Sequence, residues 1–301
     1  MIYDYLVIGA GPAGCICAGE LQKKSASVCV LEKNPEEFRK VCGDGISDAC
    51  VKILRSMDFP MDYFTEAGAV RIQKYIHFTR SGVKYEDHLK DSGKEAYGLA
   101  RNKTDAVFRR YLTCDRGVKI RYQCPVSEVS RRNGVFELCG LKANRLIIAA
   151  GASARIRING RNLIKPDIKR PAGISAIIRA EQLSEPFFMF DYKKEYMGTY
   201  AWIFQVGDRE YNAGLWLKSE QKSLHEKFRF FLKERVPDFL GTDFTFLREP
   251  KGAIMGIGSR IESKEDSVYL IGDACNSSNP LDGEGISLAI QDALRLSREI
   301  Q

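Results

Sequence analysis

Residues Tyr3–Gly14 read YDYLVIGAGPAG, and this stretch decides the fold of the chain. The aromatic and β-branched residues from Tyr3 to Ile8 predict a buried strand. Glycines 9, 11 and 14 then give the spacing G-x-G-x-x-G. In that pattern Gly9 permits a tight turn, Gly11 lets the backbone approach a pyrophosphate, and Gly14 allows close packing of helix on strand. We expect a helix from Pro12 to Lys24, with its N-terminal N–H groups aimed at the phosphates.

The segment that follows indicates which nucleotide binds. A second strand is predicted at Ser27–Leu31, with Glu32 at its end. A carboxylate there accepts hydrogen bonds from ribose hydroxyls and repels a 2′-phosphate, so the pattern favours FAD or NAD over NADP. Ala13 and Lys33 join the predicted cofactor contacts. Although a glycine-rich turn alone is a weak signal, the strand, helix and acid around it favour a nucleotide site.

A second motif lies near the other end of the chain, where residues 268–290 read VYLIGDACNSSNPLDGEGISLAI. A strand predicted at Ser267–Ile271 leads into an acid, which is where open α/β sheets bind sugar hydroxyls. A helix predicted at Glu284–Glu299 would aim its positive N-terminal end at the anionic edge of a reduced flavin. The segment alone is also compatible with an ordinary strand–loop–helix unit. Together the two motifs predict one FAD site, with cofactor contacts here at Gly272, Asp273, Gly283, Gly285 and Ile286.

Four segments resemble the geranylgeranyl reductase family, within the flavoproteins shaped like p-hydroxybenzoate hydroxylase. Cys42–Gly45 is similar to the C-G-G-G loop of that family, with Asp44 in place of a glycine. Gly98–Arg101, with Asp105 further on, resembles its R-x-x-x-D helix start. Tyr200–Phe204 matches its Y-x-W-x-F strand, and residues 283–286 match G-E-G-I. The resemblance runs from Met1 to the last residue.

The resemblance implies an α/β fold: a Rossmann-like FAD-binding domain with an inserted antiparallel β-sheet substrate domain. It also implies an FAD-dependent oxidoreductase that reduces carbon–carbon double bonds of a hydrophobic, isoprenoid-type substrate. Cys42, Tyr200 and Trp202 become the catalytic candidates. Cys42 is open to three roles: proton donor, redox partner or lining residue. The aromatic strand could form an apolar substrate wall or plain core. Further cofactor contacts implied by the resemblance are Gly43, Gly45, Arg101 and Val126.

Three departures keep other functions open. Gln205 replaces a family proline, Ala150 replaces the aspartate of an A-D-G motif, and the chain stops at Gln301 within the last predicted helix. The last departure leads us to expect a more open site and a different or smaller substrate. The alternatives are an FAD-dependent monooxygenase and a flavin-binding electron carrier. The electron donor is left open between NADPH and a ferredoxin-like protein.

Composition narrows the class further. The chain has 301 residues, 44% hydrophobic and 28% charged, which is an ordinary globular balance. No stretch is long enough for a transmembrane helix, and because the first residues already form a predicted strand we expect no signal peptide. Nine cysteines without a C-x-x-C pair suggest a reducing, cytoplasmic setting, with Cys15, Cys17 and Cys29 as small core residues. Three histidines far apart in sequence predict no metal site.

The net charge is +7, and a basic run lies between residues 155 and 170: Arg155, Arg157, Arg161, Lys165, Lys169 and Arg170. The run is open to two interpretations, a solvated linker or a surface for an anionic partner, including peripheral contact with a membrane. Nucleic-acid binding is not expected, because no recognition motif accompanies the charge.

The two halves of the site predict a discontinuous FAD-binding domain of residues 1–62, 98–160 and 250–301. Residues 63–97 and 161–249 would form the substrate domain. An amphipathic helix is predicted at Ser219–Arg235, ended by Pro237. Asn133-Gly134 predicts a hairpin turn. The remaining predicted strands are 70–78, 83–88, 118–122, 126–130, 135–139, 145–149, 174–180, 187–190, 200–205 and 211–217.

Overall fold

A computed structural model describes residues 1–164, 170–181, 185–193, 199–218 and 223–300. The chain divides into two compact units, and each is described here by itself. Unit 1 comprises Met1–Phe38, Asp105–Arg170 and Met255–Gln301, and unit 2 comprises Arg39–Thr104 and Pro171–Ile254. Residues 39–62 and 98–104 cluster with unit 2, whereas the sequence analysis placed them with the FAD-binding domain. The division into an FAD-binding and a substrate domain stays a prediction.

The centre of unit 1 is strand β1 (Tyr3–Ile8), which pairs in parallel with β2 (Val28–Leu31) and β11 (Leu141–Ile148). Strand β19 (Val268–Leu270), from the second motif, pairs in parallel with the other side of β11. Ile148 of β11 is the register partner of both Ile8 and Leu270. Both motifs therefore leave the sheet at the same edge, because parallel strands share the direction of their carboxyl ends.

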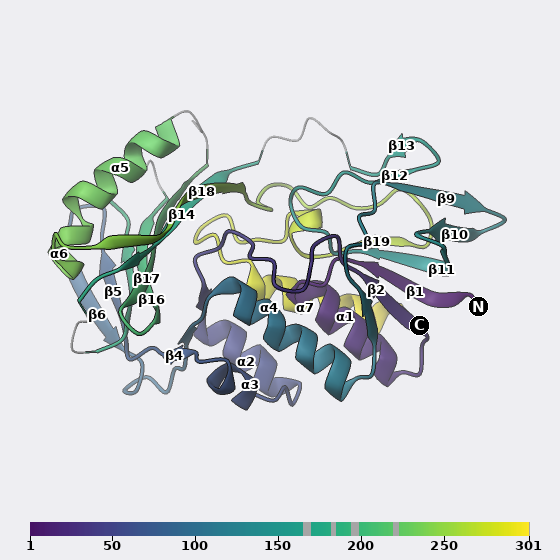
Figure 1. The fold of residues 1–301 in the computed structure, drawn as a ribbon, viewed down its shortest axis with the longest axis horizontal. Helices are drawn as coiled ribbons and strands as arrows, with labels where there is room; N and C mark the ends of the chain where they lie inside the picture. The colour runs from purple at the N-terminus through teal and green to yellow at the C-terminus, as the bar shows by residue number, and fades with distance from the viewer. Residues whose placement is uncertain (165–169, 182–184, 194–198, 219–222, 301) are drawn as a thin grey trace. The chain divides into compact units, whose positions relative to one another are not determined.

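The rest of unit 1 completes a mixed sheet and covers it with helices (Figure 1). Helices α1 (Pro12–Lys23) and α7 (Ile286–Glu299) pack on each other. The turn at Asn133-Gly134 joins β9 to β10 with positive φ at both residues, which confirms the predicted hairpin. The other elements are α4 (Arg101–Arg110), which continues from unit 2, a π-helical turn (Tyr111–Asp115), β8 (Lys119–Arg121), β9 (Glu128–Arg132), β10 (Val135–Leu138), β12 (Arg157–Ile158), β13 (Arg161–Asn162) and a 3₁₀ turn (Gly272–Cys275).

Unit 2 is built on a second sheet that is antiparallel except where β15 and β5 pair in parallel. Within the described residues its strand order is β18-β14-β17-β16-β15-β5-β6. The strands are β5 (Lys74–Phe78), β6 (Lys84–His88), β14 (Ala172–Arg179), β15 (Phe187–Asp191), β16 (Ala201–Gly207), β17 (Glu210–Leu217) and β18 (Thr245–Ile254). Smaller elements are β3 (Gly45–Ile46), α2 (Asp48–Ser56), α3 (Asp62–Glu66), β4 (Val70–Arg71) and β7 (Tyr97–Gly98).

One face of this sheet carries the apolar core of unit 2. Ala201 and Ile203 of β16 lie on it, together with Phe228 and Phe231 of helix α5 (Leu224–Glu234). The opposite face carries Tyr200, Trp202 and Phe204, as period-2 alternation predicts. The α/β fold class is confirmed. The prediction that the three aromatic residues share one face of a strand is confirmed as well.

Several boundaries differ from the prediction for local physical reasons. Helix α5 ends at Glu234, one residue before the predicted end, and Pro237 follows three residues later. It lies in the first turn of a separate helix α6 (Val236–Leu240), where its missing N–H is not needed. Helix α7 begins at Ile286, not Glu284, because Gly285 is its N-cap. The predicted strand 70–78 is two strands, β4 and β5. The predicted start at Ser219 lies outside the described residues. Among the described helices, none is both long and apolar enough to cross a membrane.

Candidate functional site

The glycine motif in unit 1 makes a turn that only glycine fits. Gly9 has φ +109°, and a Cβ added there would lie 2.4 Å from the carbonyl oxygen of Ala149. A Cβ added at Gly14 would lie 1.9 Å from the carbonyl oxygen of Gly9. Helix α1 can therefore start directly against the end of β1 only when both positions lack side chains.

The N-terminus of α1 is open to an anion. Its N-cap is Gly11, no side chain caps it, and its first turn carries no acidic residue. An uncapped helix start leaves backbone N–H groups available and carries partial positive charge. Both features suit a pyrophosphate.

Glu32 is buried at the end of β2 and braces the same turn. Its Oε2 accepts a hydrogen bond from the backbone N–H of Ala10 at 2.9 Å. Its Oε1 accepts two from the backbone and side-chain amides of Asn34, both at 2.9 Å. A carboxylate offers about four acceptor positions. One position on Oε2 thus remains for a ribose hydroxyl, while the neighbouring predicted contact Lys33 is exposed.

Arg109 is a site residue that the sequence analysis missed. It is buried on α4, and its Nε donates to the carbonyl oxygen of Ala10 at 3.1 Å. Its Nη1 donates to the carbonyl oxygen of Glu36, and its guanidinium lies 5.6 Å from the ring centre of Tyr122. Arg109 therefore ties the glycine turn to the segment after β2. The available signal was its spacing, eight residues after Arg101 on one face of the predicted helix.

The second motif lies against the first through Gly272. This residue has φ +61°, and a Cβ there would be 3.2 Å from the Cβ of Ala13 and 3.4 Å from that of Ala289. Its N–H donates to Asp292 Oδ2 of α7 at 3.2 Å. The start of α1, the end of β19 and helix α7 therefore converge at one point. The N-terminal and C-terminal motifs therefore lie together in unit 1, as predicted.

Asp273 is held in place by a hydrogen bond and by close packing. Its Oδ1 accepts a hydrogen bond from Ser278 Oγ at 2.7 Å. A Cβ at Gly256 would lie 2.4 Å from the Cα of Asp273, and a Cβ at Gly285 would lie 2.6 Å from Ser278 Oγ. Glycine at both positions is what leaves room for this arrangement. Helix α7 has no side-chain cap at Gly285, which leaves its first N–H groups free for a ligand.

The basic run between residues 155 and 170 is not all solvated linker, as one interpretation had it. Arg170 is buried and donates to Asn276 Oδ1 at 2.7 Å and to the carbonyl oxygen of Ala152. Burial lowers the pKa of its guanidinium, and nearby Arg155 adds to that effect. Arg170 thus fastens the second motif to the loop after β11. Lys165 and Lys169 lie outside the described residues.

Unit 1 fits an FAD molecule on these observations. Gly9, Gly11, Ala13 and Gly14 form the turn and helix start for the pyrophosphate, and Glu32 offers an acceptor to the ribose. Asp273 offers a carboxylate at the end of β19, and Gly283, Gly285 and Ile286 form the open start of α7. Val126 lies just before β9, partly buried against the apolar core. FAD, when bound, supplies hydride transfer, and the protein supplies position and electrostatics.

The remaining predicted residues lie in unit 2, where the Cys42–Gly45 loop packs on the aromatic face of the sheet. A Cβ at Gly43 would lie 3.4 Å from Phe204, and one at Gly45 would lie 3.2 Å from Phe188. The carbonyl oxygen of Cys42 accepts hydrogen bonds from Asn212 Nδ2 at 2.7 Å and from Ser175 Oγ at 3.4 Å. The loop is therefore fixed to β14 and β17 through its backbone, and the Cys42 side chain is left partly exposed.

Asp44 is the residue that departs from the family pattern, and its backbone explains the family glycine. It has φ +64°, a left-handed conformation that glycine adopts most easily. Its buried carboxylate accepts hydrogen bonds from Asn212 Nδ2 at 2.7 Å and from the backbone N–H of Arg101 at 2.9 Å, and it pairs with Arg39. Burial raises the pKa of the Asp44 carboxyl, while Arg39, Asn212 and Arg101 oppose that rise. Asp44 therefore binds a backbone amide at the start of α4.

Asn212 links this loop to the aromatic face and was also missed by the sequence analysis. Its Oδ1 accepts a hydrogen bond from Trp202 Nε1 at 2.9 Å. The ring of Trp202 packs against β17, where a Cβ at Gly214 would lie 2.3 Å from it. Ring centres of Phe188 and Phe204 are 4.3 Å apart, and those of Tyr200 and Trp202 are 5.9 Å apart. The result is a continuous, largely buried aromatic surface beneath the loop.

Three cysteines were predicted to be small core residues, and the structure confirms this. Cys15, Cys17 and Cys29 are buried in unit 1. Burial raises the pKa of the Cys17 thiol to about 12 and also raises the pKa of Cys15 and Cys29. Such thiols stay protonated and unreactive at neutral pH.

The structure thus places Gly9, Gly11, Ala13, Gly14, Glu32, Lys33, Val126, Gly272, Asp273, Gly283, Gly285 and Ile286 in unit 1. It places Cys42, Gly43, Gly45, Arg101, Tyr200 and Trp202 in unit 2. Close contacts join Ala13 to Gly272 in unit 1, where Ser278 also links Asp273 to Gly285, and join Gly43 to Trp202 in unit 2. The roles of the individual residues stay predictions.

Comparison with known proteins agrees with this geometry. A family profile described as an FAD binding domain matches residues 3–130. The digeranylgeranylglycerophospholipid reductase of Methanocella arvoryzae is 26% identical over 305 residues, which cover 94% of this chain and 74% of that protein. The menaquinone reductase of Mycolicibacterium smegmatis is 25% identical over 316 residues, which cover 99% of this chain and 76% of that protein.

Solved structures show the same fold. A geranylgeranyl bacteriochlorophyll reductase-like protein from Thermoplasma acidophilum superimposes with a TM-score of 0.81 at 19% identity, covering 99% of this chain and 77% of the other. A p-nitrophenol 4-monooxygenase from Pseudomonas putida gives a TM-score of 0.72 at 18% identity, covering 99% and 79%. The chain is an FAD-dependent oxidoreductase. Within that class its sequence is similar to digeranylgeranylglycerophospholipid reductases, and its fold is similar to that of a geranylgeranyl bacteriochlorophyll reductase-like protein.

Proposed function

We propose that this protein uses FAD to reduce carbon–carbon double bonds in a hydrophobic, isoprenoid-type substrate. The observation that carries the proposal is the aromatic surface of unit 2 beneath the Cys42–Gly45 loop. The rings of Tyr200, Trp202 and Phe204 follow one another on that side of the sheet, with neighbouring ring centres 5.9 and 6.1 Å apart. Such a surface suits an alkene chain, which offers no polar groups to bind. The names of the relatives support the same substrate class.

Reduction of an alkene requires a hydride for one carbon and a proton for the other. FAD supplies the hydride when bound and reduced. Cys42 Sγ is the proposed proton donor: its S–H bond breaks as a C–H bond forms, and the thiolate then takes a proton from water. The hydrogen bonds from Asn212 and Ser175 to the Cys42 carbonyl hold this residue in place. Tyr200 and Trp202 are proposed as walls that orient the chain and exclude water.

The test is anaerobic reduction of the FAD-loaded protein by dithionite, followed by separate mixing with a geranylgeranyl lipid and with air. Flavin reoxidation by the lipid, with a mass gain of two hydrogens per double bond, is the expected result. Cys42→Ala should slow lipid-dependent reoxidation about 10²-fold or more, as loss of a general acid does. The matched control is Cys114→Ala, an exposed cysteine of the π-helical turn, which should change nothing.

Reoxidation by oxygen alone, with the lipid unchanged, would reject the reductase proposal for that lipid. The alternative of a monooxygenase rests on shared fold, and it predicts oxygen incorporation into a substrate instead. The alternative of an electron carrier predicts reoxidation by a protein or dye acceptor, with no reduced lipid and no oxygenated product. If Cys42→Ala reduced the lipid at the full rate, the reductase proposal would stand and the proposal of Cys42 as proton donor would be rejected.

A further inference from the structure

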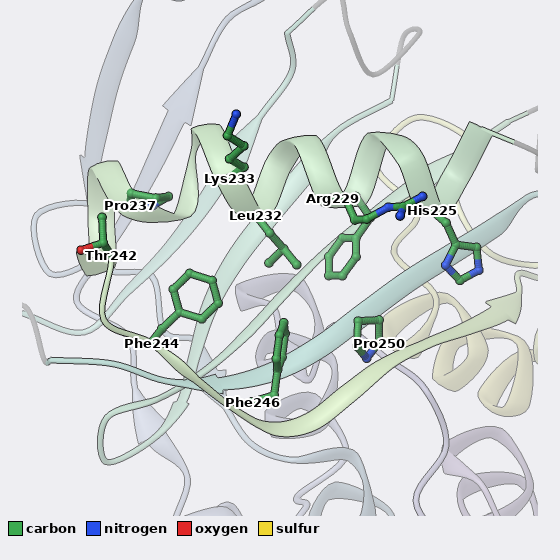
Figure 2. A pocket seen from close by; sticks show the side chains of 10 residues that line it. His225, Arg229, Leu232, Lys233, Pro237, Thr242, Phe244, Phe246 and Pro250 are labelled. Carbon is green, nitrogen blue, oxygen red and sulfur yellow. The ribbon is translucent and has the colours of Figure 1, made fainter.

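A groove in unit 2 has no part in the proposed site. It lies between helices α5 and α6 on one side and the chain from Thr242 to Pro250 on the other (Figure 2). Its volume is about 900 Å³, near the upper end of the roughly 300–1,000 Å³ typical of small-molecule sites. It belongs to the face of the sheet that carries α5, not to the aromatic face beneath the Cys42–Gly45 loop.

The inner wall of the groove is apolar. Figure 2 shows Leu232 of α5 directed toward Phe244 and Phe246. Phe246 is 40% exposed, although it lies on a strand. Large apolar side chains left open to water beside a groove mark a surface that another apolar group covers.

The outer wall of the groove is basic. On a helix with 3.6 residues per turn, Phe228 and Leu232 face the sheet, whereas His225, Arg229 and Lys233 line up along the adjacent edge. These are the three charged or titratable residues among the ten described lining residues, and none of the ten is acidic.

The cations of this edge are largely free of protein partners. Arg229 has no ion pair within the described part of the chain, and Lys233 has only an exposed contact with Glu234 at 3.6 Å. Asp243 and Glu249 border the groove in sequence but do not line it. The unsatisfied charge is positive, so the complementary ligand is anionic at one end and apolar at the other.

We infer that this groove binds an anionic phospholipid at a membrane surface, with a chain against Leu232, Phe244 and Phe246 and its phosphate near Arg229 and Lys233. An apolar floor beside a basic rim is the arrangement that holds peripheral proteins on anionic membranes. The net charge of +7 adds long-range attraction to the same surface. The inference stands apart from the proposed reaction, because it uses residues of the opposite face of the sheet.

The test is flotation of the full chain with vesicles of phosphatidylcholine, with and without phosphatidylglycerol. Wild-type protein should float only with phosphatidylglycerol, and added salt should weaken the binding. A basic residue near an anionic surface contributes about 1 kcal/mol, or roughly fivefold in affinity. The double substitution Arg229→Gln/Lys233→Gln should therefore weaken binding about 25-fold. Phe246→Ser should weaken it about tenfold through loss of apolar contact.

Matched controls come from the β5–β6 hairpin of the same unit. Arg80→Gln removes an exposed positive charge, and Val83→Ser removes an exposed apolar side chain, each far along the sheet from the groove. Neither should change flotation by more than about twofold.

The inference is overturned by equal flotation with neutral vesicles, by no flotation at all, or by equal loss from hairpin and groove substitutions. Loss with Arg229→Gln/Lys233→Gln but none with Phe246→Ser also overturns it, because binding would then be electrostatic attraction without a chain in the groove. Displacement of the protein from vesicles by inorganic phosphate or an acidic peptide at low concentration would assign the groove to that ligand instead.

Discussion

Replacement of Asn212 by leucine should unfold unit 2 at a markedly lower temperature. The substitution keeps the size of the side chain and removes three hydrogen bonds, to Cys42, Asp44 and Trp202. Two of the three partners keep another donor: Cys42 retains Ser175 at 3.4 Å, and Asp44 retains Arg39 and Arg101. Trp202 Nε1 is left buried without its acceptor.

The magnitude follows from those three losses. A buried polar group left without a partner costs about 1–3 kcal/mol, and a weakened bond to a charged group costs a comparable amount. Since two of the three partners are only weakened, we expect about 3 kcal/mol in total. For a folded unit of this size, 1 kcal/mol shifts Tm by about 2–4 °C. The expected fall in Tm is about 10 °C.

The assay is thermal unfolding followed by tryptophan fluorescence. The chain has two tryptophans, Trp202 and Trp216, and both lie in unit 2, so this signal reports on unit 2 alone. Asn162→Leu, an exposed position on β13 of unit 1, is the matched control and should leave the tryptophan transition unchanged. A double-mutant cycle with Trp202→Phe isolates the Trp202–Asn212 bond. A fall in Tm below about 3 °C for Asn212→Leu would refute the view that this network holds the loop.

Three further predictions concern other parts of the chain. Gly14→Ala should weaken FAD binding about tenfold or more, measured by titration of apoprotein, because its Cβ would lie 1.9 Å from the Gly9 carbonyl oxygen. His77 is stacked between two aromatic rings, and burial lowers the pKa of this side chain below its ordinary 6.5. The unfolded chain therefore binds this proton more tightly, so His77 should reduce stability as pH falls below about 6.5, measured by denaturant unfolding across pH. Arg235→Ala should lower the unfolding free energy by about 3–5 kcal/mol, measured in urea, because buried Asp191 would lose its partner at 2.8 Å.

Each of these has a control on the same chain. Gly252→Ala, where an added Cβ finds nothing closer than 3.5 Å, should leave FAD binding unchanged. His77→Phe should flatten the pH dependence near pH 6, and an unaltered slope would show that another group causes it. Arg179→Ala breaks an exposed pair with Glu210 at 3.1 Å and should cost less than about 1 kcal/mol. An equal cost at Arg179 and Arg235 would contradict the role given to burial.

Most of the sheet of unit 1 could be predicted from the sequence, because buried parallel strands leave strong apolar runs. Strand β1 has the predicted bounds, and helix α1 is one residue shorter than predicted. The aromatic alternation of residues 200–204 likewise revealed which side chains share a face. These features depend on local pattern alone, which a single sequence contains.

Strand β18 shows where local pattern fails. Its ten residues include Arg248, Pro250 and Lys251, and most of its side chains are exposed, so it lacks apolar alternation. Its strand structure comes from pairing with β14 at the edge of the sheet. Residues 250–254 were accordingly assigned to the FAD-binding domain, whereas they cluster with unit 2.

The motifs of the candidate cofactor site could be predicted from the sequence. The residues that hold the site in place through hydrogen bonds could not. The spacing G-x-G-x-x-G is typical of turns that bind a phosphate, so the sequence alone indicated Gly9, Gly11 and Gly14 as candidates. Asn212 and Arg109 act through bonds to residues distant in sequence, and nothing in their own neighbourhoods distinguishes them from ordinary polar positions. Long-range hydrogen bonds are specified by the fold and leave little trace in the local sequence.

The exposed edge at β18 carries a risk of self-association. On its outer side no described strand pairs with it, so its free N–H and C=O groups could template another copy of the chain. Pro250 withholds one N–H, a register shift breaks the regular ladder opposite Ser175 and Ile177, and two basic residues repel an identical strand. The sequence of β18 therefore disfavours pairing with the same strand of another copy of the chain. A variant that replaced Pro250 and Lys251 with valine would be expected to form soluble oligomers or fibres while keeping its fold.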